Sequence, residues 1–325
     1  MEPISKELID YITSGRRFLL LTHARPDGDA LGSTFGMRSV LRGAGREADV
    51  FIPSELPDRY RNFFCGALKS VEDFSKYDRV MILDCATFER IAADGFDFQN
   101  TSACLLNIDH HRGNTTCSIA SASCVDPEEA STCNLAVRLC RECGLPVGRE
   151  AATFFLAGMM TDTGNFRFSN TTGDTLRCAA ELLDSGAELE KVVNTIYFSK
   201  SMRQRNFETD LVSHALKFSP DGLIAYAYIT DEMLKRNDFD LKEDEGIIDI
   251  LREIDTVIIA MLIHRKDGAF KISLRSKDLR YPVAPVARKF GGGGHDLAAG
   301  ATIYADDIEA ALNMVMPCLE EMLNG

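Results

Sequence analysis

Short apolar runs alternate with segments of helical periodicity along the first half of the chain. The helical segments are Ala30–Gly43 and Glu128–Cys143, and Gly144 is suited to end the second one. Buried parallel strands appear as continuous apolar runs, and strands that alternate with helices indicate βαβ units. We therefore predict an N-terminal α/β domain with a mostly parallel sheet flanked by helices. The runs predicted as strands are Arg17–His23, Ala48–Ile52, Arg79–Asp84 and Cys104–Asp109.

The pattern changes in the second half of the chain. Residues 150–216 have helical spacing, and their last, polar-rich stretch is predicted to link two domains. From Gly222 onward, the strand-like runs LIAYAYI, TVIIAMLIHR and AFKISLRS follow, with the acidic helical stretch DLKEDEGIIDILREI after the first of them. The last two runs are joined by a short turn, so we expect them to be antiparallel. The predicted organisation is a first domain over residues 1–190, a helical linker over 191–218, and a smaller α/β domain with a mixed sheet over 219–325.

Composition places the chain among globular proteins. Of its 325 residues, 45% are hydrophobic and 26% are charged, and its apolar runs are shorter than the about 20 residues that a membrane span needs. The N-terminal segment MEPISKELIDYI contains acidic residues, unlike a signal peptide. Without an export signal, we expect the ten cysteines to be reduced and the protein to be cytoplasmic. The one CxxC pair, Cys140–Cys143, lacks the second pair that a structural zinc site usually has.

Charge is distributed unevenly along the chain. The formal net charge of −13 argues against non-specific binding of long nucleic acid. The segment between His264 and His295 is nevertheless basic, which indicates a local anionic ligand. Its basic residues are Arg265, Lys266, Lys271, Arg275, Lys277, Arg280, Arg288 and Lys289.

Side chains that can bind metal ions follow the predicted strands at the points where they end. The first strand leads into THARPDGDALGS, the third ends in ILDCA, the fourth ends in NIDHHRGN, and a later apolar helix ends in TDTG. Ligands of open α/β sheets bind outside the carboxyl ends of the strands, so we expect most of these side chains to meet at one edge. The set comprises His23, Asp27, Asp29, Asp84, Asp109, His110, His111 and Asp162.

So many like charges at one edge require a cation. Oxygen and imidazole ligands without thiolate suit manganese, magnesium or iron, and histidine favours a metal other than magnesium alone. The ligands are too many for one ion, whereas two ions about 3.5–4 Å apart with a shared carboxylate are a recurring arrangement for phosphoester hydrolysis. Taken singly, each acid also fits a turn or a helix cap. The joint pattern HxxxDxD, LD, DHH and TDTG, each at the end of an element, favours a two-metal site.

These motifs resemble the DHH phosphoesterase superfamily. HARPDGDALGS, MILDCA, NIDHHRGN and GMMTDTGNF resemble its four motifs in order, and SLRSKD with VARKFGGGGHDLAAGATI resembles the associated DHHA1 domain. The resemblance implies a DHH catalytic domain, a DHHA1 substrate-binding domain and an active site in the cleft between them. Within the superfamily the chain is most similar to the stand-alone bacterial NrnA-type group. We therefore expect neither the added domain of RecJ-type exonucleases nor the membrane segments of membrane-bound cyclic-dinucleotide phosphodiesterases.

The resemblance also implies a role for each motif residue. Asp84 matches the bridging carboxylate and counts among the catalytic residues. His111 is expected to contact the scissile phosphate or protonate the leaving oxygen, and Asp109 to orient a histidine. The implied cofactors are two Mn²⁺ ions, with Mg²⁺ as the alternative. The implied ligands are His23 and Asp27 for one ion, Asp29, His110 and Asp162 for the other, and Asp84 for both.

A glycine run near the C-terminus is the second candidate for function. Residues Gly291–Gly294 lie between a helical segment and a Gly-Ala-rich stretch, a setting that is unusual for a flexible linker. Backbone without side chains lets N–H groups approach a phosphate closely, and arginines bind phosphate in a bidentate manner. Phe270, Tyr281 and Phe290 are candidates for stacking on one base, with core positions as the alternative. The predicted substrate-binding residues are Ser273, Arg275, Arg288, Gly292, Gly293, Gly294 and His295, of which Ser273, Arg275 and His295 match the family's binding motifs.

We therefore expect a phosphoesterase that hydrolyses short oligoribonucleotides, pAp or both by a two-metal mechanism. A phosphodiesterase of linear or cyclic dinucleotides, such as pApA or c-di-AMP, is the alternative enzyme. A non-catalytic nucleotide sensor is the alternative of another class, and the complete set of ligand positions argues against it. The expected partners are short oligonucleotides or a mononucleotide bisphosphate rather than long duplex nucleic acid or a membrane. The sequence leaves the oligomeric state open between a monomer and a homodimer.

Overall fold

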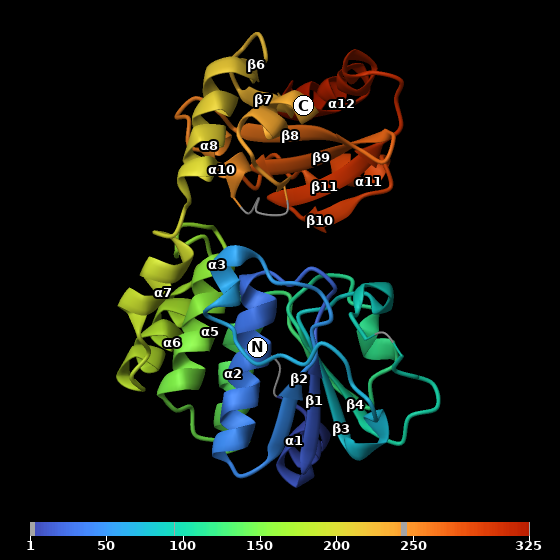
Figure 1. Cartoon of the computed structure of the whole chain (residues 1–325), viewed down its shortest axis with the longest axis vertical. Helices are drawn as coiled ribbons and strands as arrows, with labels where there is room; N and C mark the ends of the chain where they lie inside the picture. Colours follow the sequence, from blue (N-terminus) through green and yellow to red (C-terminus); the bar gives the residue numbers. More distant parts are fainter. Residues whose placement is uncertain (1–3, 94, 242–245, 325) are drawn as a thin grey trace. The chain divides into compact units, whose positions relative to one another are not determined.

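The computed structural model describes residues 4–93, 95–241 and 246–324, and the chain divides into two compact units (Figure 1). The division falls between Ser199 and Lys200. The first unit contains a parallel five-stranded sheet with helices and the second a mixed six-stranded sheet, which confirms the predicted fold class. The finer boundaries 1–190, 191–218 and 219–325 stay predictions. Residues 242–245 of the predicted acidic helix lie outside the described residues.

The sheet of the first unit has the strand order β2-β1-β3-β4-β5, and all its pairings are parallel. Its register places Leu20, Met81 and Leu106 side by side, and all three are fully buried. Four of the strands were predicted, whereas β5 has the short, mixed sequence ASCV and gives no apolar run. The strands are β1 (Arg17–Leu21), β2 (Glu47–Val50), β3 (Arg79–Leu83), β4 (Cys104–Asp109) and β5 (Ala122–Val125).

Helices of the first unit flank its sheet (Figure 1), and two of them were predicted from the sequence. Those predicted for Ala30–Gly43 and Glu128–Cys143 are α2 and α4, and Gly144 ends α4 with a φ of 63°. The helices are α1 (Lys6–Ser14), α2 (Gly28–Gly43), α3 (Asp58–Arg61), α4 (Thr132–Glu142), α5 (Arg149–Asp162), α6 (Gly173–Asp184) and α7 (Leu189–Ile196). Short 3₁₀ turns are η1 (Phe74–Lys76), η2 (Phe88–Arg90) and η3 (Thr116–Ser118).

Helices α2 and α5 lie side by side because α2 presents glycines at intervals of four residues (Figure 1). A Cβ atom on Gly32 would lie 2.7 Å from the Phe154 carbonyl oxygen and 2.9 Å from the Gly158 nitrogen. A Cβ atom on Gly28 would lie 2.3 Å from Oγ1 of Thr161. The missing side chains therefore allow the C-terminal end of α5 to meet the N-terminal end of α2.

The sheet of the second unit has the order β10-β11-β9-β8-β7-β6. Strands β7 and β8 are parallel and the other neighbours are antiparallel, so the predicted antiparallel pairing of β8 with β9 is confirmed. Asp267 and Gly268 form the turn between them with positive φ angles of 52° and 80°, as a tight hairpin requires. The strands are β6 (Leu216–Phe218), β7 (Ile224–Ile229), β8 (Ile259–Lys266), β9 (Ala269–Ser276), β10 (Gly293–His295) and β11 (Ala298–Ile303).

Helices cover both faces of this second sheet. One face packs on α11 and α12, and part of the other packs on α8 and α10. Phe207 and Leu211 of α8 are fully buried in this core, so part of the stretch predicted as a linker contributes to the second unit. Within the described residues, no helix is both long and apolar enough to cross a bilayer. The helices are α8 (Met202–His214), α9 (Asp231–Arg236), α10 (Ile247–Arg252), α11 (Ala284–Lys289) and α12 (Ile308–Asn324).

Candidate functional site

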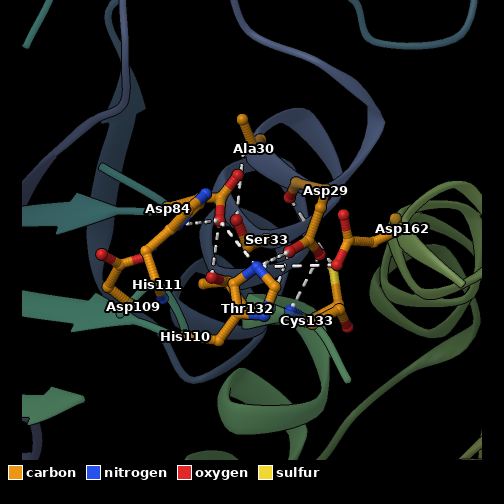
Figure 2. Close-up of polar contacts among 12 residues, drawn as sticks. Asp29, Ala30, Ser33, Asp84, Asp109, His110, His111, Thr132, Cys133 and Asp162 are labelled. Atoms are coloured by element: carbon orange, nitrogen blue, oxygen red, sulfur yellow. Dashed lines mark hydrogen bonds and ion pairs between the residues drawn. The ribbon is translucent and has the colours of Figure 1, made fainter. Parts of the chain in front are cut away.

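The predicted metal ligands of the first unit lie at the carboxyl ends of β1, β3 and β4 and at the adjoining ends of α2 and α5. Figure 2 shows Asp29, Asp84, His110 and Asp162 among them. The side chains of His23, Asp27 and Asp84 form one group, and those of Asp29, Asp84 and His110 form another. In each group, the potential ligand atoms lie within 4.8 Å of one another. Asp84 belongs to both groups, which is the geometry of a bridging carboxylate. An oxygen of Asp162 lies 3.5 Å from Nε2 of His110, beside the second group.

Asp84 follows β3 directly and adopts an unusual backbone conformation. Its φ of 54° lies in the left-handed region, where aspartate is better tolerated than most residues. Its N–H donates to the carbonyl oxygen of Ile108 at 3.0 Å, and its side chain is 2% exposed. Such strained residues concentrate at functional sites, because the surrounding structure must hold them in place. The end of β3 thus turns the Asp84 carboxylate into the centre of the cluster.

Helix N-termini hold Asp27 and Asp29. Asp27 is the N-cap of α2, and its Oδ1 accepts the N–H groups of Asp29 and Ala30 at 3.1 Å each. Asp29 is buried, and its two oxygens accept the N–H groups of Thr132 at 2.6 Å and Cys133 at 3.0 Å from the start of α4. The start of a helix stabilises a negative charge. Two helices therefore fix the two acids of the DGD motif in different directions.

The imidazoles are oriented by hydrogen bonds on their far side. Nδ1 of His110 lies 3.2 Å from the carbonyl oxygen of Glu129, so that a proton held there leaves Nε2 as a ligand, 3.7 Å from Oδ1 of Asp84. Nδ1 of His111 lies 2.7 Å from Oδ1 of Asp109, whose other oxygen accepts from the amide of Asn114. This contact is the one expected for an aspartate that orients a histidine.

The donor set fits divalent metal ions. His23 is 5% exposed, and its Nδ1 has no hydrogen-bond partner within the described residues. A buried nitrogen of this kind normally has a partner, and a metal ion would supply one. The groups of potential ligands in the described chain consist of carboxylates and imidazoles, which suit Mn²⁺, Mg²⁺ or Fe²⁺. None of them contains a cysteine, and the buried Cys140 thiol lies 3.6 Å from Sδ of Met37.

Electrostatics indicates that the cluster needs positive charge. Burial, together with the negative charges of Asp29 and Asp27, raises the pKa of Asp84 to about 8. Burial raises the pKa of Asp29 and of Asp162 to about 6, with nearby carboxylates adding to the shift. Burial opposes protonation of His111, but its hydrogen bond with Asp109 outweighs this and raises the pKa to about 9. In the absence of a cation, the site therefore retains protons that metal binding would displace.

Several predicted substrate-binding residues lie on one face of the second sheet. Arg275 of β9 and His295 of β10 are both paired with Ala298 of β11, and Ser273 and Gly293 are both paired with Gly300. Side chains alternate between faces along a strand, so Ser273 and Arg275 point to the same side. Only the small residues Ala298 and Gly300 separate them from β10. Arg288 lies on α11, which packs against the opposite face of this sheet.

The glycine run is explained in large part by packing within the unit. A Cβ atom on Gly292 would lie 2.1 Å from the carbonyl oxygen of Gly300, and one on Gly294, whose φ is 134°, would lie 2.4 Å from that of Ala298. A Cβ atom on Gly293 would meet nothing within 4 Å, and this residue is exposed. Close backbone packing therefore accounts for Gly292 and Gly294, whereas Gly291 and Gly293 have exposed backbone with no atom near the position of a Cβ.

Among the predicted stacking candidates, Phe270 is buried in the core at 1% exposure, so it does not present its ring to a base. Tyr281 and Phe290 are half-buried.

Thr132 contacts two predicted metal ligands and was not predicted from the sequence. The only signal for it was the position of Ser131 and Thr132 at the start of a helix, which is typical of capping residues.

Comparisons with known proteins agree with these motifs. The family model described as "DHH family, N-terminal domain" matches residues 17–159, and that of the "DHHA1 domain" matches residues 222–321. A protein of Thermus thermophilus named bifunctional oligoribonuclease and PAP phosphatase NrnA is 31% identical over 310 residues, which cover 94% of this chain and 89% of that protein. The protein of the same name from Bacillus subtilis is 29% identical over 93% of this chain and 94% of its own length.

Solved structures share the fold. An exopolyphosphatase-related protein from Bacteroides fragilis superimposes with a TM-score of 0.88 and 25% identity, and the match covers 99% of this chain and 98% of that one. RecJ from Thermus thermophilus, solved in complex with Mn²⁺, matches with a TM-score of 0.53 and 14% identity over 100% of this chain and 55% of RecJ. The second likeness concerns the fold alone.

Proposed function

The chain belongs to the DHH family, and from this membership we propose that it is a metal-dependent phosphoesterase that hydrolyses short oligoribonucleotides and pAp. The observation that carries the proposal is that two ligand groups, one with His23 and Asp27 and one with Asp29 and His110, share Asp84, because a carboxylate common to two metal positions suits phosphoester hydrolysis. The substrate class rests on relatives at 29–31% identity that are named oligoribonuclease and PAP phosphatase.

Each of these two ligand groups would hold one ion. When bound, the two ions would supply a hydroxide nucleophile and neutralise charge on the phosphoryl oxygens. Mn²⁺ is the proposed metal, since the site combines carboxylates with imidazoles. The ligands are His23, Asp27 and Asp84 for one ion, and Asp29, Asp84, His110 and Asp162 for the other.

His111 is the proposed acid of the reaction. Asp109 accepts its Nδ1 proton, which fixes the orientation of the ring and makes Nε2 the nitrogen that would face a substrate. A proton on Nε2 can pass to the leaving oxygen as the ester bond breaks. Asp109 thus acts through His111, and Asn114 holds Asp109 in turn.

The second unit is proposed to hold the phosphates of the substrate. Arg275 and His295 share a row of the sheet, and Ser273 and the exposed Gly293 share the next row. Arginine and backbone N–H groups are both effective phosphate partners. Because the net charge of the chain is −13, a short substrate held by a local basic face is favoured over a long polyanion. We also propose the cytoplasm as the location.

A substrate panel tests this function. The metal-free protein would be supplied with Mn²⁺ and offered pAp, pApA, c-di-AMP and labelled oligoribonucleotides of two to five nucleotides. We expect metal-dependent turnover of pAp and the short oligonucleotides, and loss of turnover by at least 10³-fold in Asp84→Asn. Asp184→Asn, an exposed acid at the end of α6, is the matched control and should retain wild-type activity.

The outcomes separate the alternatives. Hydrolysis confined to c-di-AMP or pApA would replace the proposed function with that of a dinucleotide phosphodiesterase. Nucleotide binding without turnover of any substrate would favour a sensor. Wild-type manganese-dependent turnover in Asp84→Asn would overturn the assignment of the metal centre.

A further inference from the structure

Thr132 is the first residue of α4, and it contacts two carboxylates of the candidate metal centre (Figure 2). Its backbone N–H donates to Oδ2 of Asp29 at 2.6 Å. Its Oγ1 hydroxyl donates to Oδ1 of Asp84 at 2.8 Å. Thr132 is fully buried, so water does not compete for these two hydrogen bonds. One residue therefore ties a ligand after β1 to the shared ligand after β3.

The helix start accounts for only part of this arrangement. Ser131 is the N-cap of α4, and its side chain accepts the N–H of Asn134. The Thr132 hydroxyl is therefore not needed to cap the helix. It is directed to a carboxylate that lies 48 positions away in the sequence. This points to a role in the cluster rather than in helix stability.

The Asp84 oxygen that Thr132 contacts lies close to both histidines of the DHH motif. This Oδ1 is 3.7 Å from Nε2 of His110, which belongs to the group with Asp29, and 3.6 Å from Nδ1 of His111. The two bonds of Thr132 thus reach both carboxylates of that group. Within the described chain, Thr132 contacts the other group through the shared Asp84 and forms no hydrogen bond with its His23 or Asp27.

We propose that Thr132 is a positioning residue that sets the affinity of one metal position, the one formed by Asp29, Asp84 and His110. The hydroxyl of Thr132 fixes the plane of the Asp84 carboxylate, and its backbone N–H fixes the Asp29 carboxylate. Both carboxylates are therefore oriented before an ion binds. Residues that orient metal ligands in this way typically contribute 10–100-fold to affinity. The inference rests on the proposed two-metal centre, because it assumes that each group holds an ion.

Mn²⁺ titration of the metal-free full chain by calorimetry tests the inference. Wild type should bind two ions. Thr132→Val keeps the shape but removes the hydroxyl, and it should weaken one of the two binding events by about 10–100-fold and the other, which shares only Asp84, by a smaller factor. Thr132→Ser restores a hydroxyl and should recover most of that affinity. Thr34→Val is the matched control, because the buried Thr34 hydroxyl donates to carbonyls of its own helix and, among the described residues, to no metal ligand.

The same comparison in a variant with the other metal position impaired provides a second test. In His23→Ala, which impairs the other group, the remaining binding event should respond to Thr132→Val by the same factor. Should the valine variant fail to fold, Thr132→Ala compared with Thr132→Ser measures the same hydroxyl. Two ions bound with no difference between Thr132→Val and wild type would overturn the inference alone. A wild-type chain that binds a single ion would overturn the two-metal proposal as well.

Discussion

At the scale of single residues, Asp84 carries a large electrostatic cost. It is buried beside two other carboxylates, and its pKa is raised to about 8. The left-handed backbone at this residue places the side chain where both ligand groups can share it. A carboxylate in such a position is stabilised by bound cations and is otherwise kept neutral by a proton.

The stability of the metal-free protein should therefore fall as the pH rises. The pKa of Asp84, near 8, and that of His111, near 9, are both raised above their unfolded values, so the folded chain binds more protons between pH 6.5 and 9. For each proton that only the folded state holds, the free energy of unfolding falls by about 1.4 kcal/mol for every pH unit by which the pH rises. Thermal unfolding with a chelator should show a lower Tm at pH 8 than at pH 6.5.

Mn²⁺ should reverse this trend, because the ion replaces the protons and binds more tightly at higher pH. The rise in Tm on adding Mn²⁺ should be larger at pH 8 than at pH 6.5. Asp84→Asn, which cannot lose the proton in question, should show a weaker pH dependence in the metal-free state. A metal-free wild type that gains stability between pH 6.5 and 8 would contradict this account.

At the scale of elements, the site depends on the contact between α2 and α5. Gly28, Gly32 and Gly36 form a stripe on α2 that admits residues of α5, and this contact places Asp162 beside the ligands at the start of α2. The sequence predicted both helices from their periodicity. It did not predict that they pack together, because a glycine stripe indicates close approach without identifying the partner helix.

Gly32→Val should separate the two helices. The added side chain would meet backbone atoms at 2.7 and 2.9 Å, which cannot give way as a flexible side chain can. We expect a loss of about 1–3 kcal/mol or more in the free energy of unfolding, together with weaker Mn²⁺ binding. Gly43→Ala in the same helix, where an added Cβ meets nothing within 4 Å, should change stability by no more than about 0.5 kcal/mol. Urea unfolding and Mn²⁺ titration of both variants measure this; equal behaviour would refute it.

At the scale of the whole molecule, the two units are proposed to divide the chemistry. The ligand groups belong to the first unit, and the row formed by Arg275 and His295 belongs to the second. The proposal assigns the metal ions and the reaction to the first unit and the grip on substrate phosphates to the second. Substitutions in the two units should therefore affect different kinetic and binding constants.

Arg275→Gln should raise KM for pAp and short oligoribonucleotides by about 10–100-fold, because a hydrogen bond from a charged group to phosphate contributes about 1.5–3 kcal/mol. Its affinity for Mn²⁺ should equal that of wild type. Arg280→Gln is the matched control from the same basic segment, since Arg280 is paired with Asp278. Steady-state kinetics and calorimetry decide the matter, and an unchanged KM in Arg275→Gln would remove this residue from the substrate site.

The sequence by itself determined the α/β class of both units, four strands of the first sheet, the β8–β9 hairpin and the set of candidate ligands, because apolar periodicity and motif spacing are local properties. The tertiary structure decided what depends on long-range packing. It made Asp84 common to both ligand groups, brought Thr132 to two carboxylates, buried Phe270, and assigned Gly292 and Gly294 to contacts with β11. Each of these depends on which elements become neighbours, and spacing along the chain does not specify that.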